Sequence, residues 1–309
     1  MIHLTMRQLR YFDALARLGH FGRAAQACAI SQPALSMQIK EMEDALGGVL
    51  LERNARQVVL TRFGEQLAKR VRDILRSVDE LGDFARATRD KLTGRLRLGM
   101  IPTVAPYLLP KVIGNLTRKH PEIDIHVRES KTPKLIEELV EGRLDAAIVA
   151  LPVSEPSLTE VALFSENFLL VRPPEYEGAP VPSSEMLREM RLLLLEEGHC
   201  FRDQALTFCN MQAPREMLDA SSLSTLVQMV GAGMGVTLIP EMAVGVETRS
   251  AAVSLARFAD PQPQRSIGMV WRKTSPLAKQ LLQISEVVAG AADGLRKQAA
   301  AGQGRKRRG

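Results

Sequence analysis

The apolar positions near the start of the chain follow a helical rather than an alternating pattern. From residue 6 to residue 18 they recur at helical spacing, which predicts a helix that Gly19-His20 interrupts. An alanine-rich stretch from residue 21 to residue 27 predicts a second, shorter helix. The chain is therefore expected to open with two short helices separated by a tight break.

A third helix follows, and its start is marked by particular residues. Ser31 is a plausible N-cap, and Pro33 falls in the first turn, where its missing N–H does no harm. Gly47-Gly48 ends the apolar stripe of this helix, and residues 49–61 are typical of two short strands around a polar turn. We therefore expect residues 1–62 to form a winged helix-turn-helix domain.

A long amphipathic helix comes next. The pattern begins near Arg62, with Thr61 or a neighbour as its cap, and continues to about Lys91. Such a helix is about 45 Å long, which is too long to be buried in a small domain. We expect it to pair with a second copy of itself, so that residues 63–92 act as a dimerising linker.

Beyond Thr93-Gly94 the pattern changes to alternating strands and helices. This alternation predicts an α/β domain over residues 93–290 with a largely parallel sheet covered by helices. The expected strands are 95–101, 123–129, 144–149, 164–171, 192–195, 235–240 and 267–271, and the expected helices are 107–119, 133–141, 203–208, 222–231 and 276–288.

The net charge of +6 depends on the end of the chain. The run Arg305-Lys306-Arg307-Arg308 supplies four of the six positive charges, so overall charge is weak evidence for nucleic-acid binding by the folded part. We expect residues 291–309 to form a basic, disordered tail. No basic start followed by an apolar run is present, and no stretch is long and apolar enough for a bilayer, which favours a cytoplasmic protein without membrane contact.

The cysteines suggest the chemistry. Cys200 and Cys209 lie nine positions apart, and Cys200 stands between His199 and Arg202, two groups that can stabilise a thiolate. Disulfides in the cytosol are usually transient, so this pair is typical of a redox switch rather than of a permanent crosslink. The alternative for Cys209 is a small buried hydrophobe, and Cys28 is expected in a core. The histidines have no partners at metal-ligand spacing, and we expect neither a metal nor a cofactor.

The N-terminal residues closely resemble the LysR-type transcriptional regulators. The matching segments are Met6-Arg7-Gln8-Leu9-Arg10-Tyr11-Phe12, Ala24-Ala25, Ser31-Gln32-Pro33-Ala34-Leu35-Ser36 and Leu50-Leu51-Glu52-Arg53. The second half is similar to the effector domain of this family, in which residues 231–240 fit the usual pattern. The resemblance implies a periplasmic-binding-protein-like pair of lobes, with lobe I at 93–163 and 269–290 and lobe II at 164–268.

Within this family, residues 101–110 and 194–209 look like those of the hydrogen-peroxide sensors. The resemblance implies that Cys200 reacts with peroxide and that Cys209 is the resolving cysteine. It also makes Thr103 and Thr132 candidate hydroxyl donors for the leaving hydroxide. The implied partners are promoter DNA, further copies of the chain in a homodimer or homotetramer, and RNA polymerase, with activation of antioxidant genes after oxidation.

The recognition helix and the wing supply candidate DNA contacts. The N-terminal residues of a recognition helix face base edges, and glutamine, serine and small apolar side chains suit adenine edges and thymine methyl groups. Wing arginines suit phosphates or the minor groove. The candidates are Gln32, Pro33, Ala34, Ser36 and Gln38 on the helix, and Arg53, Arg56 and Arg62 on or beside the wing.

Two other functions fit parts of the sequence. One is a LysR-type regulator that binds a small metabolite between its lobes, and the other is a thiol peroxidase that uses the same cysteine pair. A helix of nine residues spans about 13.5 Å, whereas disulfide formation needs Cα atoms within roughly 7 Å. We therefore expect that a bond between Cys200 and Cys209 requires the intervening segment to unwind or shift.

Overall fold

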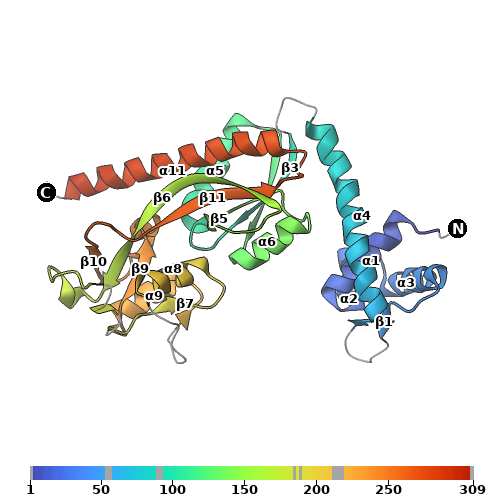
Figure 1. Ribbon diagram of the computed structural model, residues 1–309, viewed down its shortest axis with the longest axis horizontal. Helices are drawn as coiled ribbons and strands as arrows, with labels where there is room; N and C mark the ends of the chain where they lie inside the picture. The colour runs from blue at the N-terminus through green and yellow to red at the C-terminus, as the bar shows by residue number, and fades with distance from the viewer. Residues whose placement is uncertain are drawn as a thin grey trace. The chain divides into compact units, whose positions relative to one another are not determined.

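The computed structural model describes residues 3–52, 58–87, 93–183, 186–187, 190–210 and 219–306. The chain divides into two compact units, Met1–Ala85 and Arg86–Gly309 (Figure 1). The first unit contains three short helices, a two-stranded wing and the long helix α4, and the second contains a large sheet with helices packed on it. Each unit is described by itself below.

The helices of the first unit begin and end where the sequence predicts. The caps follow local chemistry: Ser31 accepts a hydrogen bond from the backbone N–H of Ala34, and Gly47 ends its helix in the left-handed conformation that glycine adopts at little cost. Leu35 and Phe12 lie in the core that joins the three helices. The elements are α1 Met6–Leu18, α2 Phe21–Ala27, α3 Gln32–Leu46, β1 Leu51–Glu52 and β2 Val59–Leu60.

Helix α4 spans Arg62–Ala87, and Thr61 caps it by accepting a hydrogen bond from the backbone N–H of Gly64. The start agrees with the prediction, whereas residues 88–92 of the predicted linker lie outside the described part of the chain. The N-terminal turns of α4 pack into the core of the first unit through Ala68 and Val71. Farther along, apolar side chains recur at helical spacing and are exposed within this chain, namely Ile74, Val78, Leu81 and Phe84.

The second unit is built on a seven-stranded sheet whose strand order is β10-β6-β11-β5-β3-β4, with β9 also pairing with β6. Within the described part of this sheet, β3 pairs in parallel with β4 and β5, whereas the pairs of β6 and β11 are antiparallel. The prediction of a largely parallel sheet is therefore wrong for the sheet as a whole. The strands are β3 Gly94–Met100, β4 Ile123–Glu129, β5 Ala146–Leu151, β6 Leu158–Arg172, β9 Thr237–Pro240, β10 Ser254–Arg257 and β11 Gln264–Arg272.

Two separate hydrophobic cores divide this unit into two lobes, and the long strand β6 passes from one to the other. Phe164 belongs to the first-lobe core and Phe168 to the second-lobe core, so the lobes part within β6. The lobe boundaries expected from the sequence, after residue 163 and after residue 268, fall within β6 and β11 respectively. The remaining elements are α5 Ala105–Lys119, α6 Thr132–Val140, η1 Pro174–Tyr176, β7 Leu194–Leu195, α8 Cys200–Phe208, β8 Asp219–Ala220, α9 Leu223–Gly231, η2 Glu241–Ala243, α10 Val244–Glu247 and α11 Ala278–Lys306.

The end of the chain differs from the prediction. Helix α11 continues to Lys306, so residues 291–306 are helical and not a disordered tail. Ala291 and Ala292 are buried in the first-lobe core, where α11 packs against α5. Burial of small side chains against a neighbouring helix supplies the packing energy that the alanine-rich composition alone does not reveal.

Candidate functional site

Helix α8 has one candidate cysteine at each end. Cys200 is its first residue and Cys209 is its C-cap, so the helix begins three residues before the predicted start at residue 203. Cys200 is half-buried and packs against the first-lobe core, whereas Cys209 is fully buried within the second-lobe core. Neither cysteine forms a disulfide in this structure. The helix therefore separates the two sulfurs and assigns each one to a different lobe.

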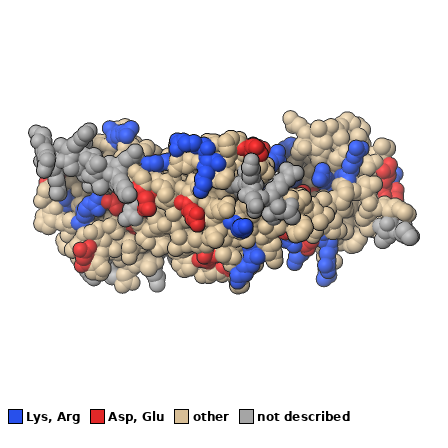
Figure 2. All heavy atoms as spheres, turned by 90° about the horizontal axis from the view of Figure 1, so that it is seen from above, with Lys and Arg blue, Asp and Glu red and all other residues tan. Residues whose placement is uncertain are grey.

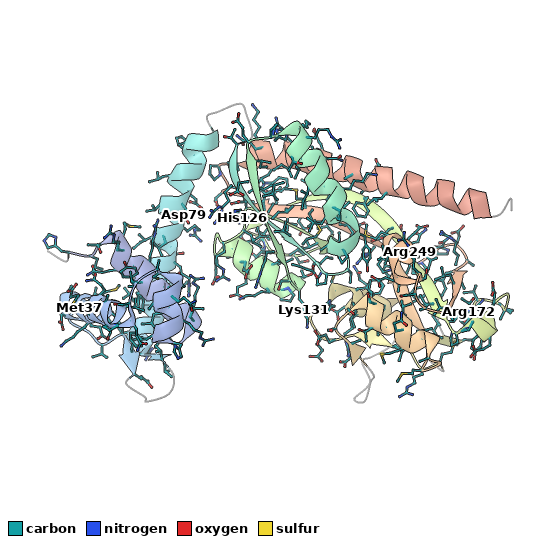
Figure 3. All side chains as sticks on the ribbon, turned by 180° about the vertical axis from the view of Figure 1, so that it is seen from behind. Met37, Asp79, His126, Lys131, Arg172 and Arg249 are labelled. Atoms are coloured by element: carbon teal, nitrogen blue, oxygen red, sulfur yellow. The ribbon has the colours of Figure 1, made fainter. Side chains whose placement is uncertain are left out.

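The loop before Cys200 contacts the first lobe through a lysine that sequence reasoning did not single out. Lys131, which precedes the first residue of α6, donates from Nζ to the backbone carbonyl of Glu197 at 2.7 Å. The same nitrogen lies 2.9 Å from a carboxylate oxygen of Glu196. In Figure 3, Lys131 lies between α6 and the second lobe. The two lobes are thus connected directly beside the reactive-cysteine candidate.

His199 is almost completely buried, with 4% of its surface exposed. Burial lowers the pKa of its imidazole, and the positive charge of Lys131 lowers it further, while Glu196 acts in the opposite direction. The imidazole is therefore neutral at neutral pH. A neutral imidazole can act on a nearby thiolate as a hydrogen-bond donor but not as a positive charge.

Thr103 is connected to the first turn of α8 by a buried arginine. Arg265 donates from Nη1 to Thr103 Oγ1 at 2.8 Å and from Nη2 to the backbone carbonyl of Thr103 at 3.0 Å. Its guanidinium lies 5.3 Å from the ring centroid of Phe201, the residue after Cys200. Because Thr103 Oγ1 accepts from Arg265, its own hydrogen can be donated elsewhere.

The charge of Arg265 is balanced by a residue directly opposite it. Glu166 on β6 is the register partner of Arg265 on β11, and the carboxylate accepts hydrogen bonds from Nε at 2.9 Å and Nη2 at 2.8 Å. Both side chains are almost inaccessible to solvent. Glu166 falls within the predicted strand 164–171, where a buried charge would need a partner, but Arg265 lies just before the predicted strand 267–271 and nothing in the sequence connects the two.

Two polar atoms near the N-terminus of α8 and α6 are buried without a hydrogen-bond partner among the described residues. These are Thr132 Oγ1, at the start of α6, and Gln204 Oε1, one turn after Cys200. Unsatisfied buried oxygens are uncommon and suit a small polar molecule. Arg202 is directed elsewhere: its Nη1 donates to the backbone carbonyl of Leu195 at 2.9 Å and lies 4.0 Å from Asp219.

A second polar connection between the lobes lies away from the cysteines. The phenol of Tyr107 on α5 donates to Glu247 on α10, whose other carboxylate oxygen accepts a hydrogen bond from Ser224 on α9. Burial and the neighbouring carboxylate raise the pKa of Tyr107, so the phenol remains protonated and remains a donor. The aromatic ring of Tyr107 belongs to the second-lobe core although α5 belongs to the first lobe.

The candidate DNA-contacting residues fall into three groups. Gln32, Pro33 and Ser36 are exposed at the start of α3, and Arg62 is exposed at the start of α4. Ala34 and Gln38 are half-buried, and the amide of Gln38 donates to Glu41 at 2.7 Å. Two further candidates, Arg53 and Arg56, lie outside the described residues.

Charge and membrane criteria add little further. On the face drawn in Figure 2, basic and acidic side chains are interspersed rather than segregated. Among the described residues, no helix is both long and apolar enough to cross a membrane. No group of three or more His, Cys, Asp or Glu side chains in the described ranges could hold a metal ion.

A winged helix-turn-helix with a long linker helix, joined to a two-lobed α/β domain, defines a DNA-binding transcriptional regulator with its own input domain. The family model "LysR substrate binding domain" matches residues 89–292. The model "Bacterial regulatory helix-turn-helix protein, lysR family" matches residues 6–65. The chain belongs to the LysR family of bacterial regulators.

Particular relatives are similar over nearly their whole length. A probable hydrogen peroxide-inducible genes activator from Streptomyces viridosporus is 44% identical over 290 residues, which are 91% of this chain and 92% of the relative. The DNA-binding transcriptional dual regulator OxyR from Escherichia coli K12 is 40% identical over 94% of this chain and 97% of its own. The H2O2-bound structure of a cysteine-to-serine mutant of Corynebacterium glutamicum OxyR is 32% identical, with a TM-score of 0.68, and covers 98% of this chain and 97% of its own.

Proposed function

We propose that this LysR-family regulator senses hydrogen peroxide through Cys200 and Cys209 and activates antioxidant genes in response. The observation that carries the proposal is the placement of the two thiols at opposite ends of α8 and in different cores. Relatives named as hydrogen peroxide-inducible activators, and an OxyR structure with bound H2O2, support the choice of peroxide as the signal.

The proposed chemistry uses both thiols and consumes one peroxide. The thiolate of Cys200 attacks one peroxide oxygen, so an S–O bond forms, the O–O bond breaks, and the departing hydroxide takes a proton and leaves as water. The thiol of Cys209 then attacks the sulfenic acid sulfur, an S–S bond replaces the S–O bond, and a second water leaves. Two thiols are thereby oxidised, and H2O2 is reduced to two waters.

The second step requires α8 to change. Nine residues of helix separate the Cα atoms by about 13.5 Å, and a disulfide needs them within roughly 7 Å. Cys209 must also leave the second-lobe core, or Cys200 must leave its contact with the first lobe. Either movement alters the packing between the lobes, and this coupling carries the signal.

Four residues are proposed to support the peroxide site. Thr103 and Thr132 present hydroxyls from the first lobe, and both can donate to a leaving oxygen. His199 contributes a neutral imidazole as a hydrogen-bonding group. Arg202 stands in the first turn of α8 and fixes that turn to the end of β7 through Leu195.

The other end of the chain is proposed to bind promoter DNA as a homodimer or homotetramer in the cytoplasm, with RNA polymerase as a downstream partner. The exposed start of α3 and the apolar stripe on α4 support this assignment. The proposed contacts are Gln32, Pro33, Ala34, Ser36 and Gln38, together with Arg62 and the wing residues Arg53 and Arg56. We infer that the chain is a regulator and not an enzyme, since a turnover thiol peroxidase needs no DNA-binding unit.

The proposal is tested by transcript profiling of cells that carry the wild-type chain or single-cysteine variants, before and after a brief low dose of peroxide. We expect induction with the wild type and with Cys28→Ser, and none with Cys200→Ser or Cys209→Ser. Induction that persists in Cys200→Ser would mean that another group, or a metabolite bound between the lobes, supplies the signal.

A further inference from the structure

Lys131 connects the first lobe to the loop that carries the reactive-cysteine candidate. Its Nζ lies 2.7 Å from the carbonyl oxygen of Glu197 and 2.9 Å from the carboxylate of Glu196, although the lysine and Glu197 are 66 positions apart in sequence. The lysine directly precedes α6 of the first lobe (Figure 3), and both of its partners lie in the loop that follows β7 of the second lobe. Cys200 follows this loop directly.

The aliphatic stem of Lys131 also fixes the path of the loop. Gly198 has a φ of +87°, a left-handed conformation that favours glycine, and a Cβ placed on it would lie 3.0 Å from Lys131 Cδ. The stem therefore packs on the one loop residue that has no side chain. Any displacement of the lysine frees the backbone two residues before Cys200.

Lys131 is also connected to α6 of the first lobe through its own backbone. It is the residue before α6, its carbonyl accepts a hydrogen bond from the backbone N–H of Leu135, and the next residue is Thr132, whose hydroxyl oxygen is buried without a described partner. One residue thus connects the segment of Thr132 with the segment of His199 and Cys200.

We propose that Lys131 is a positioning residue for the thiol chemistry: it holds the loop of residues 196–199, and with it His199 and Cys200, in register with Thr132. This proposal rests on the proposed function and adds a residue to its site. The ion pair with Glu196 is partly exposed and by itself contributes little. Lys131 instead positions the loop through its hydrogen bond to the Glu197 carbonyl and its packing on Gly198. It also places a fixed positive charge beside the buried imidazole of His199.

The charges around His199 give the proposal a signature that simple loosening of the loop would not produce. Lys131, just before α6, lowers the pKa of His199, and Glu196 from the loop itself raises it. Arg202 on α8 is directed to the Leu195 carbonyl and toward Asp219. Removing the lysine charge should therefore raise the pKa of His199, and removing the Glu196 charge should lower it further.

The test measures the rate at which peroxide oxidises Cys200 in the full chain, across a range of pH, by trapping the sulfenic acid in a Cys209→Ser background. We expect Lys131→Met to slow oxidation roughly tenfold, a fraction of what a misplacement of about 1 Å can cost. The oxidation rate should change with pH as His199 ionises. The midpoint of that change should move to higher pH in Lys131→Met and to lower pH in Glu196→Gln. Lys131→Arg should restore most of the rate.

Lys134→Met is the matched control, because Lys134 lies in the first turns of α6, three residues after Lys131, and among the described contacts pairs only on the surface with Glu137 at 2.8 Å. It should oxidise at the wild-type rate. The proposal is overturned if Lys131→Met keeps the wild-type rate and pH profile, or if Lys131→Met and Glu196→Gln shift the profile in the same direction. Failure of peroxide to oxidise the unmodified Cys200 would instead refute the proposed function itself.

Discussion

Cys200 and Cys209 close the two ends of one helix, yet they pack in different hydrophobic cores. The half-buried Cys200 lies against the first lobe, and the fully buried Cys209 lies inside the second. A disulfide between them cannot form while α8 remains helical, so the proposed bond requires this helix to unwind or shift.

The hydrogen bond from Tyr107 to Glu247 stabilises the contact between the lobes. Tyr107→Phe removes the donor and leaves a buried carboxylate oxygen with one partner fewer, which should reduce the free energy of unfolding by about 1–2 kcal/mol. Urea unfolding of the regulatory domain can be followed by the fluorescence of Trp271, the single tryptophan of the chain. Tyr176→Phe, at an exposed tyrosine, should leave the midpoint unchanged. Equal midpoints for Tyr107→Phe and the wild type would contradict this role.

The buried pair of Arg265 and Glu166 should be sensitive to removal of one partner only. Arg265→Met leaves Glu166 charged and buried, and should cost about 3–5 kcal/mol of unfolding free energy. The double variant Arg265→Met with Glu166→Leu removes both charges and should be more stable than the single variant. Trp271 fluorescence reports both transitions, because this residue lies on the same strand as Arg265. A double variant less stable than the single one would show that the Glu166 charge is not destabilising once Arg265 is removed, which contradicts this account.

The recognition role of α3 can be tested at Ser36, which is exposed on this helix. Ser36→Glu introduces a negative charge toward the phosphates and should abolish operator binding in an electrophoretic shift assay, while the helical circular dichroism signal stays the same. Thr117→Glu, which adds the same charge on an exposed position of α5, is the control and should bind normally. Unchanged affinity in Ser36→Glu would place DNA on another surface.

Buried histidines should make the stability depend on pH. The pKa values of His199 and His120 are lowered, chiefly by burial, so the unfolded chain takes up their protons first as the pH falls. Their contribution is fully present above about pH 6.5 and is lost as the pH falls through the lowered folded-state values. On going from above to below this pH, the urea midpoint of His199→Gln should therefore fall less than that of the wild type. An identical loss in both chains would exclude His199 as a contributor.

Local signals in the sequence were sufficient to predict the helices of the first unit. Ser31 as a cap, Gly47 as a terminator and the regular apolar spacing each depend on neighbours within a few residues, and the structure confirms the helices they predict. The start of α8 was missed because His199, its N-cap, makes no side-chain capping bond. The helical extension of α11 was missed because its cause is packing on α5, which lies far away in sequence.

Contacts between residues far apart in the sequence also limited the prediction of the candidate site. The cysteines, His199 and Thr103 could be named from residue types and family resemblance. The residues that organise them could not, since Lys131 meets Glu197 across 66 positions and Arg265 meets Thr103 across 162. Contacts at such separation follow from the sheet register and the lobe arrangement, and no local pattern encodes them.

The most direct test of the central claim measures disulfide formation and helix loss on one sample. Reduced full-length protein is treated briefly with a low dose of peroxide, and the cysteine linkage and the amide hydrogen exchange of residues 200–208 are determined by mass spectrometry. The account predicts a Cys200–Cys209 disulfide, absent in Cys200→Ser, together with faster exchange across α8. Persistent free thiols, or a disulfide formed while α8 keeps its slow exchange, would contradict it.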